Sequence, residues 1–211
     1  LGLPKENIKV YIDATYGKIL GALSTLKQIS QAYKGDINVI FYYAGHGVPN
    51  EKNNEAYLLP ADATPSMLEA CLPLSSLYSS IGSIDAKQAI VFMDACFSGS
   101  RRENGMIVSA RGIAIKPKKD IVTGNVVVFS AADGSETAYP YKEKGHGLFT
   151  YFLLKKLKES RGNVTLGDLA DYIKTNVSQK SIVVNNKSQT PTISSSAQMQ
   201  DVWRTMKLFR K

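Results

Sequence analysis

Apolar and polar residues follow two different patterns along this chain. Three short runs are almost continuously apolar, as expected for strands buried on both faces of a parallel sheet: residues 38–43, 89–93 and 126–129. Stretches with apolar side chains at helical spacing alternate with them, at residues 18–33, 74–84, 148–157 and 166–177, with Thr165 as an N-cap. Weaker patterns predict short strands at 8–12 and 182–184 and a loop or edge strand at 189–196. We therefore expect a three-layer α/β/α sandwich with a mainly parallel central sheet.

Two residues suited to catalysis follow two of the buried runs. The tripeptide Gly45-His46-Gly47 comes directly after the first run, and Cys96 comes shortly after the second. In open parallel sheets, ligands bind beyond the carboxyl ends of the strands. The sequence therefore predicts that His46 and Cys96 meet at one edge of the sheet.

The residue types at this edge point to nucleophilic catalysis. A thiol attacks as the thiolate, and a neighbouring imidazole is the usual group that generates it and protonates a leaving amine. The flanking glycines allow close backbone approach, so the amides of Gly47 and Cys96 are candidates for stabilising an oxyanion. Asp94 lies two residues before Cys96 on an extended segment and is expected on the same side, where it suits a cationic substrate.

A second histidine competes with His46 on spacing alone. His46 lies 50 residues before Cys96, and His146 lies 50 residues after it, again between two glycines. His46 ends a buried run, whereas His146 follows the charged residues 142–144 and begins an amphipathic helix. Because a helix N-terminus disfavours a protonated imidazole, we expect His46 to be the acid/base partner.

Together, the segments around His46 and Cys96 resemble a known family. Residues 41–47 (Phe-Tyr-Tyr-Ala-Gly-His-Gly) and 92–99 (Phe-Met-Asp-Ala-Cys-Phe-Ser-Gly) are similar to the catalytic motifs of the metacaspase and bacterial caspase-like branch of the caspase superfamily, peptidase family C14. Supporting similarities occur at residues 57–62, 129–132 and 145–151, and the resemblance covers roughly residues 8 to 195. It implies a caspase-like fold, a dyad of His46 and Cys96, and a structural place for His146 at a helix start.

The resemblance also implies a specificity. Animal caspases carry Gln two residues before the nucleophile and cleave after Asp, whereas metacaspases and paracaspases carry Asp there, lining a pocket for Arg or Lys. This chain has Asp94, and Ser130 matches a position that borders the same pocket. The expected activity is therefore endopeptidase cleavage after Arg or Lys through a thioester on Cys96. The alternative for Asp94 is a capping or hydrogen-bonding carboxylate at a strand end.

The charge of the chain is concentrated in one segment. The sequence has 211 residues, which fits a single domain over 1–211, and its net charge is +8. Residues 101–120 carry six basic and two acidic residues, and aromatic residues are not interleaved with them. This pattern favours a basic loop or processing linker at 100–120 over a nucleic-acid-binding face. An enzyme that prefers basic residues could cleave itself there, after Arg102, Arg111 or Lys119.

Several other functions are disfavoured. No run approaches the ~18 apolar residues of a membrane span, and no signal peptide is recognisable, so a cytoplasmic location is favoured. Cys71 and Cys96 do not form a disulfide framework or a paired zinc motif with the two histidines. The acidic cluster that binds calcium in many metacaspases is not evident, so no metal or cofactor is expected. The family's first strand and helix have no counterpart after Leu1, which suggests a partial or trimmed chain.

Three rival functions remain open at this point. The chain could be a catalytically silent caspase-like scaffold, although keeping both His46 and Cys96 argues against this. It could bind nucleic acid through its basic segment, with a steeply salt-dependent affinity. It could also be a peptidase of the same fold that cuts after Asp or Asn. The sequence gives no oligomeric state and no physiological substrate beyond a peptide or protein.

Overall fold

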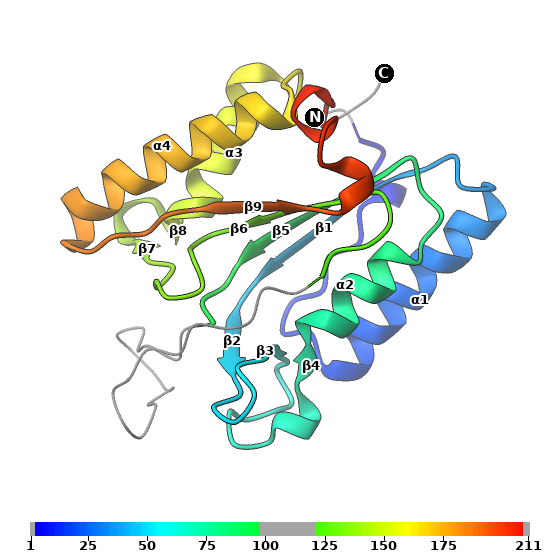
Figure 1. The fold of residues 1–211 in the computed structure, drawn as a ribbon, viewed down its shortest axis with the longest axis horizontal. Helices are drawn as coiled ribbons and strands as arrows, with labels where there is room; N and C mark the ends of the chain where they lie inside the picture. Colours follow the sequence, from blue (N-terminus) through cyan, green and yellow to red (C-terminus); the bar gives the residue numbers. More distant parts are fainter. Residues whose placement is uncertain (1–2, 98–120, 209–211) are drawn as a thin grey trace.

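The architecture is built around one four-stranded sheet. The structure, a computed structural model, describes residues 3–97 and 121–208. The sheet has the order β1-β5-β6-β9 and lies at the centre of the molecule (Figure 1). Its strands are β1 (Asn38–Ala44), β5 (Gln88–Asp94), β6 (Val126–Ser130) and β9 (Thr192–Ser195). The first three are parallel and β9 runs antiparallel to β6, so the predicted mainly parallel sheet is confirmed.

Two pairs of helices cover the two faces of this sheet (Figure 1). Their bounds are α1 Tyr16–Ala32, α2 Leu74–Gly82, α3 Leu148–Ser160 and α4 Leu166–Asn185. Alternate side chains of β5 serve the two layers: Ile90 and Phe92 join the core under α3 and α4, and Val91 and Met93 join the core under α1 and α2. This is the expected three-layer sandwich, with the predicted helices in place.

Two small antiparallel sheets accompany the central sheet. A small antiparallel sheet consists of β2 (His46–Pro49), β3 (Ala56–Leu59) and β4 (Leu72–Pro73), and a two-stranded ladder consists of β7 (Pro140–Tyr141) and β8 (His146–Gly147). The 3-10 turns are η1 Lys5–Asn7, η2 Leu68–Ala70, η3 Lys142–Lys144, η4 Ala197–Met199 and η5 Trp203–Thr205. No helix in the described part of the chain is both long and apolar enough to cross a membrane.

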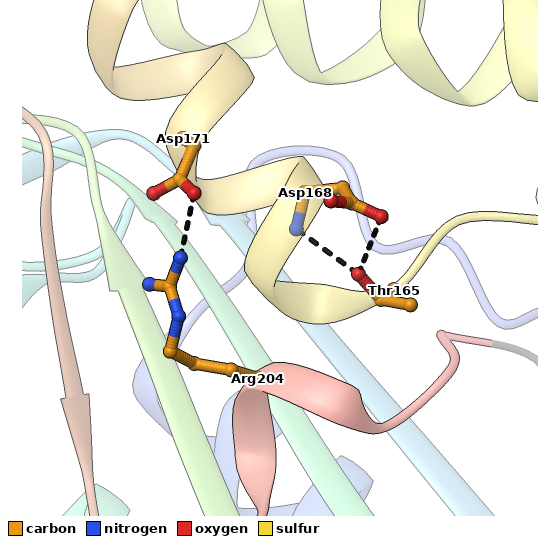
Figure 2. A network of polar contacts seen from close by, with 4 residues as sticks. All are labelled: Thr165, Asp168, Asp171 and Arg204. Atoms are coloured by element: carbon orange, nitrogen blue, oxygen red, sulfur yellow. Dashed lines mark hydrogen bonds and ion pairs between the residues drawn. The ribbon is translucent and has the colours of Figure 1, made fainter.

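The start of α4 is fixed by polar contacts that also hold the C-terminal segment (Figure 2). Thr165 is the predicted N-cap: its hydroxyl accepts from the Asp168 amide at 3.1 Å and donates to the Asp168 carboxylate at 2.7 Å. One turn further along, Asp171 pairs with Arg204 of η5 at 2.6 Å. The cap defines where α4 begins, and the ion pair links α4 to η5, while the buried apolar side chains of α4 hold the helix against the sheet.

Two predicted strands are wrong. Residues 8–12 form no strand, and their side chains are exposed, with Val10 at 76% and Ile12 at 79%. Their alternating pattern is typical of a half-buried strand, but an extended segment forms a strand only when a neighbour pairs with it. Residues 182–184 are the exposed last turn of α4, which runs on to a left-handed cap at Asn186. Three β-branched residues in a row suggested a strand there, but the preceding helix continues through them.

The first strand is buried less completely than its apolar run predicts. All of β5 is buried, whereas on β1 only Val39 is buried, and Ile40 and Tyr42, which face the α3 side, are exposed. β1 is an edge strand of the described sheet, and its inner face packs on the core under α1 and α2. The expected loop or edge strand at 189–196 contains β9, the edge on the other side.

Candidate active site

The ends of β1 and β5 bring the two predicted catalytic segments together. In the parallel ladder Ala44 pairs with Asp94, and the amide of Gly45 then donates to the Asp94 carbonyl at 3.2 Å. The chain after β1 therefore stays beside the chain after β5 for at least one more residue. His46 follows immediately and begins β2.

A tyrosine at the end of β1 fixes the backbone around His46. The Tyr43 hydroxyl lies 2.9 Å from the carbonyl oxygen of His46 and 3.2 Å from that of Leu59, and its single proton is shared between the two acceptors. His46 and Leu59 also face each other in the β2–β3 ladder. A Cβ on Gly45 would lie 2.6 Å from the Tyr43 hydroxyl oxygen, so this approach requires glycine. The His46 side chain itself is exposed.

The backbones of the two segments touch at Gly47 and Cys96. A Cβ on Gly47 would lie 2.6 Å from the Cys96 carbonyl oxygen and would overlap the Phe97 ring. Only a glycine backbone can therefore approach the nucleophile segment this closely. The Cys96 side chain is 9% exposed, and its Sγ lies 4.0 Å from the carbonyl oxygen of Ala138, a weak thiol hydrogen bond. The structure thus places the His46 and Cys96 segments side by side, as the sheet rule predicts.

Asp94 lies under the first turn of α3 and is only 4% exposed. Its Oδ2 accepts from the Thr150 hydroxyl at 2.5 Å and from the Thr150 amide at 3.4 Å. The N-cap residue of α3, Gly147, has no side-chain cap, so Asp94 supplies a capping carboxylate from a different strand. The alternative considered for Asp94, a capping carboxylate at a strand end, is therefore what these contacts show.

A tyrosine extends this network across the exposed side of β1. The Tyr42 hydroxyl lies 2.7 Å from the Thr150 hydroxyl oxygen. Since the single proton of the Thr150 hydroxyl points to Asp94, Tyr42 donates to Thr150. Burial raises the pKa of the Tyr42 phenol, the hydrogen bond to Thr150 lowers it, and the charge of Asp94 raises it again. The phenol therefore keeps its proton at neutral pH and remains a donor.

The other predicted site residues occupy distinct places. Ser130 is the last residue of β6, partly buried, between Met93 and Thr192 in the sheet register. His146 begins β8 opposite Tyr141 and leads into α3, with an exposed side chain. It therefore lies just before the start of a helix, as expected.

Some sequence predictions concern residues elsewhere in the chain. Cys71 is buried at the end of η2, next to β4; burial, and to a lesser extent the nearby Glu69 charge, raises the pKa of its thiol. Arg102, Arg111 and Lys119 lie outside the described residues. Within residues 3–97 and 121–208, no three His, Cys, Asp or Glu side chains gather in a way that could hold a metal ion.

Comparison with known proteins identifies the family. The family model of the caspase domain, Peptidase C14, matches residues 5–202, nearly the whole chain. The chain belongs to this family. The match includes both segments of the site and every strand of the central sheet, so the resemblance read from the two motifs is confirmed over the full fold. Caspase-domain proteins are cysteine peptidases that act on proteins.

Individual relatives agree with this assignment. The chain is 28% identical over 158 residues to a protein named paracaspase from Dictyostelium discoideum, covering 75% of this chain and 36% of that protein. It therefore spans about a third of that relative. The crystal structure of caspase-1 from Spodoptera frugiperda superposes with a TM-score of 0.60 at 14% identity, over 90% of this caspase-domain chain and 71% of that one. Protein GSU0716 from Geobacter sulfurreducens gives 0.58 at 19% identity, over 84% and 72%.

Several contacts at this caspase-domain site had no recognisable signal in the sequence, although Tyr43 and Thr150 lie within the similar segments 41–47 and 145–151. Tyr43, Thr150 and Ala138 reach the site through hydrogen bonds with His46, Asp94 and Cys96, respectively. The bonds from Thr150 and Cys96 join residues 56 and 42 positions apart. No local pattern marks such partners.

Proposed function

We propose that this protein is a cysteine endopeptidase that cleaves peptide bonds after Arg or Lys, with Cys96 as nucleophile and His46 as acid/base partner. The single observation that carries the proposal is the contact between the two segments, where Gly47 lies directly on the Cys96 carbonyl. The parallel ladder of β1 and β5 brings the two segments together, and a glycine at position 47 leaves bare backbone beside Cys96. Bare backbone at this point suits the close approach of a substrate carbonyl.

In the proposed reaction, the Cys96 thiolate attacks the carbonyl carbon of the scissile bond and forms a tetrahedral oxyanion. The amides of Gly47 and Cys96 donate to this oxyanion, which preorganised donors stabilise strongly. The intermediate collapses as the C–N bond breaks, and His46 protonates the departing amine. Water then attacks the Cys96 thioester, His46 accepts its proton, and the acid product leaves with the thiolate restored.

Asp94 is the proposed recognition group for the basic side chain of the substrate. Its carboxylate is nearly buried, and both hydrogen bonds from Thr150 go to the same oxygen, Oδ2, which fixes the orientation of the group. A fixed, desolvated carboxylate pairs strongly with a guanidinium or ammonium group brought by a substrate. Ser130, at the end of the adjacent strand, borders the same pocket in this proposal.

Fluorogenic peptides ending in Arg, Lys, Asp or Asn test the chemistry and the specificity together. Wild type should cleave the Arg and Lys peptides, and Cys96→Ala should abolish cleavage. Asp94→Asn keeps an acceptor for Thr150 but removes the charge, so kcat/KM for Arg peptides should fall by about 100-fold, near 3 kcal/mol for a charged hydrogen bond. Activity that survives Cys96→Ala contradicts the mechanism. If Asp94→Asn cleaves Arg peptides as well as wild type does, Asp94 is a helix cap and not a recognition group. If wild type prefers Asp or Asn peptides, the proposed specificity for Arg or Lys is wrong.

Self-cleavage in the basic segment is a consequence of the same specificity. Arg102, Arg111 and Lys119 are the proposed cleavage positions, and they lie outside the described residues. Intact-mass spectrometry of wild type beside Cys96→Ala tests this directly. Fragments ending at these residues should appear in the wild type alone. Identical fragments in both proteins would mean that another protease makes the cuts.

A further inference from the structure

One buried glutamine holds both ends of the loop that follows β6. This loop, residues 131–139, connects β6 to β7, and we call it the β6–β7 loop. The Gln189 side chain, 0% exposed, donates from Nε2 to the Ala131 carbonyl at 2.9 Å and accepts at Oε1 from the Tyr139 amide at 2.8 Å. The Gln189 side chain therefore bridges the first and last residues of the loop.

Further contacts tie the same loop to the segment before β9. The Thr190 amide donates to Glu136 Oε2, and the Thr190 hydroxyl donates to Glu136 Oε1 at 3.1 Å. The backbone of Gln189 is fixed in turn, because its amide donates to the Ser181 hydroxyl of α4 at 3.1 Å. The connection between α4 and β9 thus anchors the β6–β7 loop through Gln189 and Thr190.

The loop presents one backbone group to the nucleophile. The Ala138 carbonyl oxygen is the acceptor 4.0 Å from Cys96 Sγ, and Ala138 and Cys96 belong to the same packed cluster. Ala138 is fully buried and directly precedes Tyr139, whose amide Gln189 holds. The position of this carbonyl, and with it the cover over the thiol, therefore depends on Gln189.

We propose that Gln189 is a positioning residue that holds the β6–β7 loop against Cys96 and so fixes the thiol in its reactive place. The role of this placement in turnover rests on the function proposed above. Gln189 touches neither the thiol nor a substrate group in this scheme. It acts through Ala131 and Tyr139, so its replacement keeps both proposed catalytic side chains but releases the loop that positions the Cys96 thiol.

A second buried glutamine provides a matched control. Gln88, 1% exposed, begins β5 at the opposite end of the sheet, and its Nε2 donates to the carbonyls of Lys207 and Leu208 at 3.1 and 3.2 Å. Gln189→Met and Gln88→Met each remove a buried amide that bridges two backbone groups, with little change in side-chain volume. Both should lower the melting temperature, since each leaves backbone groups unsatisfied.

The decisive measurement is the alkylation rate of the two cysteines, followed by peptide-resolved mass spectrometry after timed exposure to iodoacetamide. Cys71 is also buried, next to β4 of the small sheet and outside the β6–β7 loop, so it reports loosening that is not confined to this loop. Gln189→Met should accelerate modification of Cys96 relative to Cys71 by at least about fivefold, because the loop opens locally. The same variant should lower kcat on Arg peptides by about tenfold or more with a smaller change in KM. Gln88→Met should leave both the alkylation ratio and kcat near wild type.

Two outcomes overturn the inference: equal acceleration at Cys71 and Cys96 in Gln189→Met, or the same changes in Gln88→Met. If Gln189→Met does not fold, Thr190→Val decides instead, because it removes only the hydroxyl bond to Glu136. It should shift the Cys96 to Cys71 ratio in the same direction, and an unchanged ratio rejects the inference. If wild type cleaves none of the peptides, the proposed function fails, while the alkylation ratio still accepts or rejects the placement of the thiol by Gln189.

Discussion

The same tripeptide, Gly-His-Gly, occurs at residues 45–47 and 145–147, and the two copies lie against different neighbours. Each histidine begins a short antiparallel strand, and each has an exposed side chain. In the first copy, Gly47 lies on the backbone of Cys96. In the second, Gly147 lies on the side chain of Asp94, where a Cβ would be 2.9 Å from the carboxyl carbon. One copy approaches the backbone of Cys96, and the other approaches the carboxylate of Asp94, two residues before it.

This difference shows why spacing alone could not choose between the histidines. Both are 50 residues from Cys96, and both are flanked by glycines. A Cβ on Gly45, Gly47 or Gly147 would meet a neighbouring group, whereas Gly145 has open space around it and a left-handed backbone with φ 67°. What distinguishes the two copies is the neighbour of the second glycine, the Cys96 backbone for Gly47 and the Asp94 side chain for Gly147. The first copy follows a strand of the central sheet and can bring an imidazole to the thiol. The second copy leads into α3 and completes the surroundings of Asp94.

Replacing each histidine should separate the two copies most strongly. We expect His46→Ala to lower kcat/KM on Arg peptides by about 10²- to 10⁴-fold, the usual contribution of a general acid/base. His146→Ala removes an exposed side chain at a helix start and should change kcat/KM by no more than about threefold, as for other surface substitutions. Steady-state kinetics of both variants, with circular dichroism to verify folding, makes the comparison. If kcat/KM instead falls strongly in His146→Ala and stays near wild type in His46→Ala, His146 is the acid/base partner.

The second glycine of each copy should give the next largest contrast. In Gly47→Ala the new methyl group meets the Cys96 carbonyl, which is backbone and cannot turn aside, so the two segments must separate. Displacement of a reacting group by about 1 Å costs on the order of 100-fold in rate, and we expect this loss in kcat. In Gly147→Ala the methyl group displaces the Asp94 carboxylate, so KM for Arg peptides should rise more than kcat falls. The ratio of the kcat and KM changes, measured for both variants, checks this; equal patterns in the two variants would contradict it.

The central sheet and the proximity of the His46 and Cys96 segments could be predicted from the sequence, because strands buried on both faces have a recognisable pattern. β5 and β6 are buried on both faces, and strands of this kind have continuous apolar runs. β1 is the parallel neighbour of β5, so the carboxyl ends of these two strands share an edge, and the segments that carry His46 and Cys96 lie side by side there. Residues 8–12 were misjudged because alternation reports only what could be buried if a partner strand were present.

The polar contacts around the site were beyond prediction for a different reason. Thr150 reaches Asp94 across 56 residues, and Gln189 reaches Ala131 across 58. Each partner is a common residue type in an ordinary helix or loop, and hydrogen bonds between distant segments leave no periodic trace in the chain. Such contacts depend on how layers pack, which the pattern of one element does not specify.

Two adjacent tyrosines of β1 provide the smallest and most discriminating contrast. Tyr43 points to the α1 and α2 side and holds the His46 and Leu59 carbonyls, whereas Tyr42 points to the α3 side and donates to Thr150. Tyr43→Phe removes one donor proton, which is shared by two carbonyls and worth about 0.5–1.5 kcal/mol, so the His46 segment should loosen and kcat should fall by about two- to tenfold.

Tyr42→Phe removes one bond at the edge of the Asp94 network and should raise KM for Arg peptides by about threefold or less, with kcat unchanged. The two substitutions are chemically identical and one residue apart, so general effects on β1 are common to both. Kinetics on Arg peptides should therefore show a kcat effect for one and a KM effect for the other. If Tyr42→Phe lowers kcat as much as Tyr43→Phe does, the two faces of β1 do not serve the two Gly-His-Gly copies separately.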